Sequence, residues 1–156
     1  AVEADRGRIA EILVFAKRMA YRPIFQDDFY SFHLLNVHDT AQEVDPSAAL
    51  GWEEDGILKG VLTFGPARDQ DCLDCCEVYE LYIDLCFQRE GIGSRLMGEV
   101  LRKTRNQPVV LWCLEPNGAA LGFYHSQGFC PDGARRLVEG TPVWEIRLRR
   151  PAPEPF

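Results

Sequence analysis

The sequence lacks any apolar run long enough to cross a membrane, and no apolar signal-peptide core lies near its start. Positive charge is also scarce, since 17 Lys and Arg residues stand against 24 Asp and Glu residues, for a formal charge of −7. This acidic balance argues against a protein that binds nucleic acids or anionic membranes. We therefore expect a cytoplasmic protein with no nucleic-acid partner and no membrane partner.

A complete metal-binding motif is also lacking. Cys72, Cys75 and Cys76 form one C-x-x-C-C, but a structural zinc site needs four ligands, usually from two such pairs. The other cysteines and the three histidines show no second pair at ligand spacing. We expect no metal, and we interpret the six cysteines as free thiols that are buried or half-buried in strands.

The chain has 156 residues, of which 46% are hydrophobic and 11% aromatic, typical of one globular domain with its own core. No internal repeat and no linker divides it. We predict a single domain over residues 1–150, followed by a disordered tail, PAPEPF, over residues 151–156.

The first third of the chain predicts two helices. Apolar residues recur on one face of residues 5–20, where Asp5 can cap the helix and Pro23 should stop it. A second, shorter helix rich in aromatics is expected over residues 27–37. Two strands then flank Asp55 and Gly56, a dipeptide typical of hairpin turns.

The remainder alternates strands and helices. We predict strands over residues 76–84 and 108–114, with a helix after each, and two final strands joined near Gly140. The order indicates a mixed α/β fold. Only four residues precede the first helix, so a leading strand would be short or missing.

Two glycines, Gly91 and Gly93, lie where the third strand gives way to a helix. The turn could be an ordinary one, a dinucleotide-binding turn, or a cradle for another pyrophosphate, because unpaired N–H groups and the dipole at a helix start attract anions. Glu115 lies where a dinucleotide-binding fold would have its acidic residue. However, Leu96 stands where that motif has its third glycine, and the turn before Gly91 is longer than the motif allows. No Lys-Ser or Lys-Thr follows, which excludes a Walker loop.

Two motifs in the sequence match those of a known family. Gln88, Gly91 and Gly93 match Q/R-x-x-G-x-G/A, and a second motif, N-x-x-A-x-x-F-Y-x-x-x-G-F, starts at Asn117 and ends at Phe129. Over about residues 76–130 the chain resembles the GNAT superfamily of acyl-CoA-dependent N-acyltransferases. Leu85 departs from the proline of many members. The resemblance implies a mixed, mostly antiparallel sheet flanked by about four helices.

The resemblance also implies acetyl-CoA as co-substrate. Its pyrophosphate would lie on the turn that begins at Gln88, and its pantetheine arm would hydrogen-bond the strand backbone, as an added strand would. The implied cofactor-binding residues are Leu81, Tyr82, Ile83, Gln88, Arg89, Glu90, Gly91, Ile92, Gly93, Ser94 and Asn117. Arg89 and Arg95 could add charge-assisted hydrogen bonds. Asn117 could equally serve as a helix cap alone.

Acyl transfer to an amine needs a group that protonates the departing thiolate and, in some enzymes, a base. Tyr124 is the candidate acid, since a phenol can donate this proton; without the motif it would be interpreted as a buried tyrosine with one hydrogen bond. Glu77 matches the position of a catalytic glutamate in some members, and Glu80 is the second candidate base. Either could be a solvated carboxylate on a sheet face, and many members need no base.

We thus predict an N-acetyltransferase that moves an acetyl group from acetyl-CoA to a primary amine by direct attack in a ternary complex. The alternatives are a non-catalytic acyl-CoA-binding or sensing domain and, less favoured, an NAD-binding domain. The acceptor could be a small-molecule amine or a protein or peptide amine. Its pocket should involve the first two helices and the final hairpin, with Tyr21, Phe25, Phe29, Tyr30 and Phe32 as candidate lining residues. A homodimer is a family-level expectation.

Overall fold

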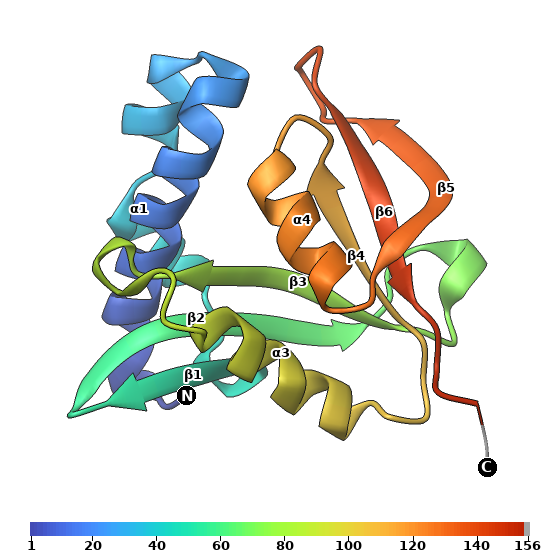
Figure 1. Cartoon of the computed structure of the whole chain (residues 1–156). Helices are drawn as coiled ribbons and strands as arrows, with labels where there is room; N and C mark the ends of the chain where they lie inside the picture. The colour runs from blue at the N-terminus through green and yellow to red at the C-terminus, as the bar shows by residue number, and fades with distance from the viewer. Residues whose placement is uncertain (155–156) are drawn as a thin grey trace. The chain divides into compact units, whose positions relative to one another are not determined.

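A six-stranded sheet and four α-helices form the described part of the chain, residues 1–154 of a computed structural model (Figure 1). The helices are α1 (Arg6–Phe25), α2 (Val37–Glu43), α3 (Ile92–Lys103) and α4 (Gly118–Ser126). The strands are β1 (Ala49–Glu54), β2 (Ile57–Pro66), β3 (Cys76–Ile83), β4 (Val109–Leu114), β5 (Cys130–Leu137) and β6 (Trp144–Arg150).

The strand order in the sheet is β1-β2-β3-β4-β6-β5. β3 pairs with β4 in parallel, whereas β1 with β2, β4 with β6, and β5 with β6 pair antiparallel. The predicted mixed, mostly antiparallel α/β fold is thereby confirmed. No strand precedes α1 in the described residues; a 3-10 turn at Glu3–Asp5 stands there instead.

Internal contacts divide the chain into two compact units. Unit 1 comprises Ala1–Thr63 and Glu80–Met97, and unit 2 comprises Phe64–Tyr79 and the chain from Gly98 onward. The single domain expected over residues 1–150 stays a prediction. So does the tail over residues 151–156, of which residues 151–154 have no regular secondary structure and residues 155–156 lie outside the described residues.

The core of unit 1 is the apolar face of α1 packed on the first hairpin. Ile9, Ile12 and Leu13, all almost fully buried, contact a group of residues from β1 and β2. Those residues are Ala49, Leu58 and Val61. Burial of each such side chain is worth roughly 1.5–3 kcal/mol, so this face fixes α1 against the sheet. α2 lies beside α1 (Figure 1).

The predicted end of α1 at Pro23 is wrong, because the helix continues to Phe25. Pro23 lies in the last turn of α1. Its missing N–H removes one backbone hydrogen bond there, but the helix is also held by its buried face. The helix closes at Gln26, a left-handed residue (φ 52°) whose N–H donates to the Arg22 carbonyl at 2.9 Å. Asp5 stands at the N-cap but does not cap through its side chain, which accepts from the Val2 N–H at 2.9 Å.

The helix predicted over residues 27–37 is also wrong in form. The structure has a π-helix at Tyr30–Leu34, closed by a hydrogen bond from the Leu35 N–H to the Tyr30 carbonyl at 2.8 Å. Arg18 of α1 donates to the Ser31 carbonyl at 2.7 Å and to the Leu35 carbonyl at 3.0 Å. A side chain of α1 thus satisfies two backbone carbonyls of this segment. α2, which the sequence interpretation missed, starts after an Asn36 cap.

In unit 2, a buried arginine ties the loop after β2 to the end of the sheet. Arg147 of β6 is 6% exposed and donates from Nη1 and Nη2 to Asp71, each at 2.7 Å. Its Nε donates to Asp132 at 2.6 Å, and Nη1 reaches Asp69 at 3.2 Å. The hydrogen bonds from Arg147 lower the pKa of the Asp71 carboxyl. A cation with three carboxylate partners explains how an arginine can be buried here.

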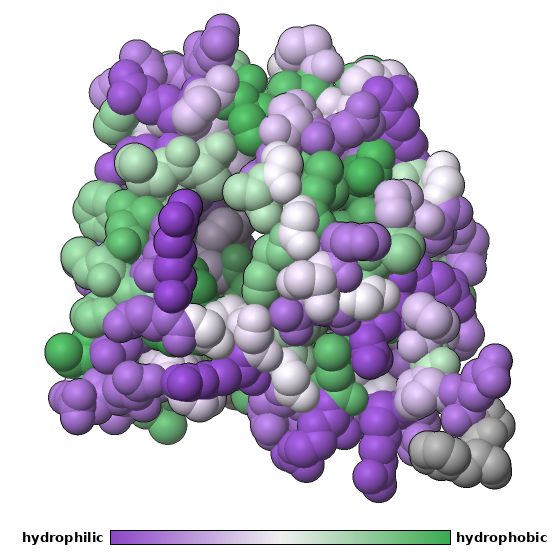
Figure 2. All heavy atoms as spheres, viewed as in Figure 1, coloured by the Kyte–Doolittle hydropathy of each residue, from purple (hydrophilic) through white to green (hydrophobic). Residues whose placement is uncertain are grey.

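Polar and charged side chains cover much of the face seen in Figure 2, with hydrophobic ones among them. Among residues 1–154, no helix is both long enough and apolar enough to cross a membrane.

Candidate functional site

The glycine turn in unit 1 begins where β3 ends. Asp84, the residue after β3, accepts a hydrogen bond from the Cys86 N–H at 2.7 Å and a second from the guanidinium of Arg8 on α1. Burial raises the pKa of the Asp84 carboxyl, but these hydrogen bonds and the charge of Arg8 outweigh burial, so the net pKa is lowered. Asp84 thereby holds the short 3-10 turn Leu85–Phe87 that leads into the glycines.

The turn itself is exposed and contains two left-handed residues, Arg89 (φ 65°) and Gly91 (φ 79°). A side chain at Gly91 would meet no neighbouring atom within 4 Å, so what this position requires of glycine is its backbone conformation. α3 starts at the next residue, Ile92, and its first N–H groups have no acceptor within the helix. The predicted cradle residues Gln88–Ser94 therefore lie together at a helix N-terminus.

A close approach between β2 and α3 fixes the turn. A Cβ added to Gly60 would lie 2.7 Å from Ile83 Cδ1, 3.0 Å from Ile92 Cγ2 and 3.2 Å from Leu96 Cδ1. Only glycine at this position lets the first turn of α3 and the end of β3 pack so near the β2 backbone. Ile92 is buried as a result, at 2% exposure, while Gly91 and Ser94 stay exposed.

Arg95, expected to add charge at the turn, is engaged by the first hairpin. Its Nη1 lies 3.3 Å from Oε1 of Glu54, and its guanidinium lies 5.2 Å from the centre of the Trp52 ring. The same Glu54 oxygen accepts from the Trp52 indole N–H at 2.6 Å. Half of the Arg95 side chain is still exposed, so these contacts orient the guanidinium without covering it.

The last residues of β3, Leu81–Ile83, are half-buried in unit 1. The hydroxyl groups of Tyr82 and Tyr21 form a short hydrogen bond, which ties β3 to α1. The ladder between β3 and β4 pairs Cys76 with Val109 and Glu77 with Val110, the first two residues of β3.

The two candidate bases have different surroundings. Glu77, in unit 2, is 1% exposed; its Oε2 accepts from the Arg68 N–H at 3.0 Å and from Arg68 Nε at 3.1 Å, and its Oε1 accepts from Nη2 at 2.7 Å. Glu80, in unit 1, pairs through Oε2 with Lys17 of α1 at 2.5 Å. Glu77 is thus held by its neighbours, whereas Glu80 lies beside open space.

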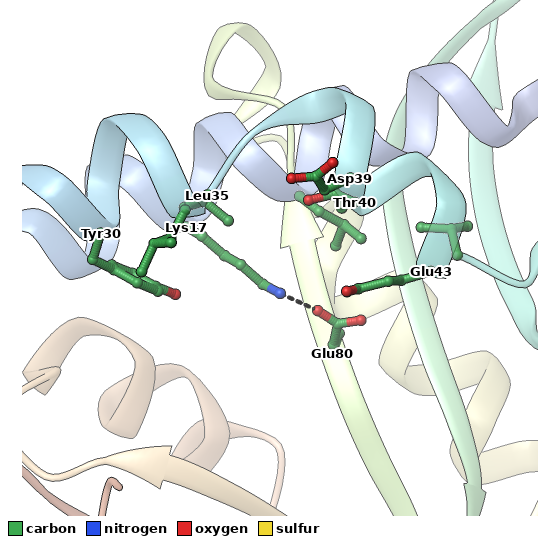
Figure 3. A pocket seen from close by; sticks show the side chains of 10 residues that line it. Lys17, Tyr30, Leu35, Asp39, Thr40, Glu43 and Glu80 are labelled. Carbon is green, nitrogen blue, oxygen red and sulfur yellow. Dashed lines mark ion pairs between the residues drawn. The ribbon is translucent and has the colours of Figure 1, made fainter. Parts of the chain in front are cut away.

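That open space is a cavity of about 240 Å³ in unit 1, between α1, the π-helix, α2 and β3 (Figure 3). Its polar lining comes from Lys17, Tyr30, Asp39, Thr40, Glu43 and Glu80. Figure 3 shows Glu43 and the Lys17–Glu80 pair facing the same space. Of the five aromatics proposed to line an acceptor pocket, Tyr30 is the one that lines this cavity.

The other proposed aromatics serve different contacts. Tyr21 packs edge-on against Phe25 and Tyr82, and Phe25 against Tyr30. Phe29, 62% exposed, stacks on a histidine, and Phe32 lies under two guanidinium groups.

Unit 2 carries the second motif. The Asn117 side chain accepts from the Ala120 N–H at 3.2 Å, so its role as a cap of α4 is confirmed. Tyr124 is half-buried on α4, with its ring 5.3 Å from that of Phe123 and 6.1 Å from that of Phe129, both edge-on. Phe129 is buried, at 1% exposure, and Gly128 is left-handed (φ 90°) just past the helix.

All six cysteines are free, as predicted, but Cys86 and Cys130 are exposed, and Cys72, Cys75 and Cys86 lie outside strands. Burial raises the pKa of Cys75 and of Cys113 to about 11, which keeps these thiols protonated at neutral pH. Among the described residues, Asp69, Asp71 and Cys72 offer ligand atoms within 4.8 Å of one another. The Arg147 guanidinium contacts all three, at 3.4 Å from Cys72 Sγ, so a cation of the protein already occupies this group.

Sequence reasoning missed Lys17 and Glu43 as residues of the cavity. A signal was available for Lys17. Lys17 and Tyr21 are one helical turn apart on α1 and share a face of the helix, and Glu80 and Tyr82 are two residues apart on β3 and share a face of the strand. Opposing faces of a helix and a strand bring the two pairs into contact.

The model of the Acetyltransferase (GNAT) family matches residues 8–129. The chain belongs to this family. A GNAT relative from Mycobacterium tuberculosis, "Probable N-acetyltransferase Rv2775", is 36% identical over 113 residues, which cover 66% of this chain and 64% of that protein. N-alpha-acetyltransferase RimI of the same organism is 42% identical over 74 residues, 46% of this chain and 47% of that protein.

The matched segment thus spans less than two thirds of the length of either curated GNAT relative. Among solved structures, "yncA, a putative ACETYLTRANSFERASE from Salmonella typhimurium with its cofactor Acetyl-CoA" superimposes with a TM-score of 0.73 at 21% identity, covering 100% of this chain and 93% of the other. At that identity the likeness shows the GNAT fold alone.

Proposed function

We propose that this chain is an N-acetyltransferase that moves an acetyl group from acetyl-CoA to a primary amine by direct attack in a ternary complex. The observation that carries the proposal is the turn at the start of α3. Two left-handed residues, Arg89 and Gly91, lead directly into the N-terminus of a helix in a chain of the GNAT family. Such a terminus favours a diphosphate.

The binding roles follow the two motifs. The N–H groups of residues 89–94 would receive the pyrophosphate, with Gln88 at the start of the turn. The backbone of Leu81–Ile83 would hydrogen-bond the pantetheine arm, and Asn117, beyond its cap role, would contact the coenzyme. The proposal is supported by the β3–β4 ladder, which uses the first two residues of β3, whereas the arm would use the last three.

The chemistry requires a neutral amine, a polarised thioester carbonyl and a protonated leaving thiolate. A backbone N–H near Ile83 would polarise the carbonyl as a preorganised donor. Tyr124 would donate its phenolic proton to the thiolate as the C–S bond breaks. For the base, the contacts favour Glu80 over Glu77, because Glu80 has a single ion pair, through Oε2, while both oxygens of Glu77 accept from Arg68.

The test is thiol release from acetyl-CoA with a panel of amines: alkyl monoamines, diamines, amino acids and peptides with free N-termini. Relatives named for N-alpha-acetylation justify including N-terminal peptide amines. Amine-dependent release supports the proposal. Tight binding of coenzyme A without release on any amine would point to an acyl-CoA sensor instead, and stabilisation by NAD but not coenzyme A would point to a dinucleotide-binding domain.

A cytoplasmic location, expected from the sequence, and a homodimer, expected from the family, belong to the same proposal. Light scattering after size-exclusion chromatography would decide the oligomeric state.

A further inference from the structure

The cavity beside Glu80 is too small for a whole cofactor, since drug-sized ligands occupy roughly 300–1,000 Å³. At about 240 Å³ it suits a short chain or a single side chain. Leu13, Leu35 and Val44 form its apolar wall, which would pack against methylene groups. Polar groups from α1, the π-helix, α2 and β3 line the same space, so a ligand here would have an aliphatic part and a polar end.

The charges of the cavity define that polar end. Asp39, Glu43 and Glu80 bring three carboxylates, and Lys17 is the one cation among its lining residues. Lys17 is committed to Glu80 at 2.5 Å, and Asp39 accepts from the Asn36 amide at 2.8 Å. Among residues 1–154, the Glu43 carboxylate has no ion pair or hydrogen bond. A second cation would therefore find Glu43 available, because the other two carboxylates already have partners.

One cation of the protein itself lies in the wall of the cavity. The Lys17 ammonium, on its own four-carbon chain, enters from α1, forms the ion pair with Glu80 and lies 5.6 Å from the centre of the Tyr82 ring. The wall residues thus already pair with one alkylammonium group, that of Lys17. Figure 3 shows Glu43 reaching toward that pair from α2.

We propose that this cavity binds an alkylammonium group of the acetyl acceptor that does not itself react, with Glu43 as the residue that selects it. The inference rests on the proposed function, since it names the class of acceptor: an amine that carries a second, aliphatic cation. Two sources share this chemistry, a free diamine and the lysine side chain of a peptide whose N-terminus reacts. Glu43 is a specificity residue here, because it would bind the non-reacting end.

The experiment compares acceptors that differ only in the second cation. The free-amine arm uses 1,4-diaminobutane against butylamine, and the peptide arm uses Ala-Lys against Ala-norleucine, all at low ionic strength because salt screens exposed charges. The variant is Glu43→Gln. The matched control is Glu53→Gln, which removes the same charge from an exposed position on β1, outside the cavity.

We expect kcat/KM to be about tenfold higher for the dicationic member of one arm than for its monocationic partner, the effect of one charge-assisted hydrogen bond at a partly exposed site. Glu43→Gln should remove that ratio while leaving the monocationic rate unchanged, and Glu53→Gln should preserve it. The arm that shows the ratio identifies the source. An unchanged ratio in Glu43→Gln, or no ratio in either arm of the wild type, would overturn the inference.

Direct binding keeps the inference testable apart from the reaction. Calorimetric titration of 1,4-diaminobutane and of Ala-Lys into wild type, Glu43→Gln and Glu53→Gln, each with its monocationic partner as reference, needs no turnover. If no amine supports thiol release, the proposed function fails; selective loss of dication binding in Glu43→Gln would still support the cavity as an alkylammonium site. Equal binding by all three proteins would refute it.

Discussion

Arg68 holds Glu77 through three hydrogen bonds, two from its guanidinium at 2.7 and 3.1 Å and one from its backbone N–H at 3.0 Å. The arrangement satisfies both oxygens of a buried carboxylate. Burial of a charge is tolerated only with such partners. We infer that Glu77 stabilises the start of β3, and that Glu80, which has a single ion pair through Oε2, is the residue to test as the base.

Replacing the two glutamates separates these roles. Glu77→Gln should lower the free energy of unfolding by about 1–2 kcal/mol, because it weakens charge-assisted hydrogen bonds to Arg68. Glu80→Gln should lower kcat about 10²-fold or more, with a smaller effect on stability, as expected for loss of a base. Urea unfolding and steady-state kinetics on both variants provide the measurement. A folded Glu77→Gln protein with the larger loss of kcat would reverse the assignment.

The glycine turn is tested by placing a charge in it. Gly91→Glu should abolish binding of coenzyme A, because a carboxylate would stand where the diphosphate is expected, while the protein still folds at a cost of about 1–2 kcal/mol for a left-handed non-glycine residue. Gly56→Glu is the matched control: Gly56 has φ 75° in the β1–β2 turn and open space around it, so it carries the same strain and charge. Equal binding by both variants would argue against the cradle.

Tyr124→Phe tests the proposed acid. Loss of the phenolic proton donor should lower kcat by about 10²–10⁴-fold and leave the affinity for coenzyme A nearly unchanged. Tyr79→Phe is the control, because its hydroxyl donates to the Pro66 carbonyl at 2.6 Å and its removal should affect stability alone. An undiminished kcat in Tyr124→Phe would remove Tyr124 from the mechanism.

Asp84 should make stability depend on pH. Its net pKa is lowered in the folded protein, so its contribution is present above the unfolded pKa of about 3.9 and is lost as pH falls through the lower folded value. Asp84→Asn, whose amide oxygen can still accept from the Cys86 N–H, should cost about 1 kcal/mol at pH 7 and progressively less below pH 4. Urea unfolding from pH 7 to 3 measures the difference in stability between wild type and Asp84→Asn. A difference that does not change with pH would contradict the prediction.

Arg147 should be the arginine of unit 2 that stability depends on most. Arg147→Met leaves Asp69, Asp71 and Asp132 facing one another without their cation, and we expect a loss of about 2–3 kcal/mol, below the usual range for a fully buried pair because Asp71 is exposed. Arg136→Met, at an exposed ion pair, should cost less than about 1 kcal/mol. Thermal unfolding measures both variants. A loss of stability in Arg147→Met no larger than that in Arg136→Met would contradict the assignment.

Much of the fold was predictable because its signals are local. The apolar period of α3, the continuous apolar run of β4, the Asp55–Gly56 turn and the Asn117 cap each depend on neighbours in the sequence, and each is found in the structure. The segment before α2 was not predictable in the same way. Its π-helix reflects hydrogen bonds from Arg18, a residue of another helix, to carbonyls of the segment.

The candidate site divides along the same line. The left-handed turn and the start of α3 follow from Gly91 and the residues beside it, and they lie where the sequence predicts. The partner of Glu80 could not be read from β3 alone, since Lys17 belongs to α1 and the two meet only through tertiary packing. The roles of the site residues in binding and catalysis stay predictions.

The most direct test of the account is transfer of the acetyl group itself. Wild type and Gly91→Glu are each incubated with acetyl-CoA and the amine panel, and mass spectrometry records the acetylated amine alongside thiol release. If the proposed function is right, an acetylated product forms only when both the wild-type protein and an amine are present. Gly91→Glu should lose this product and Gly56→Glu should keep it. Acetyl-CoA bound by wild type but returned unchanged with every amine would contradict it.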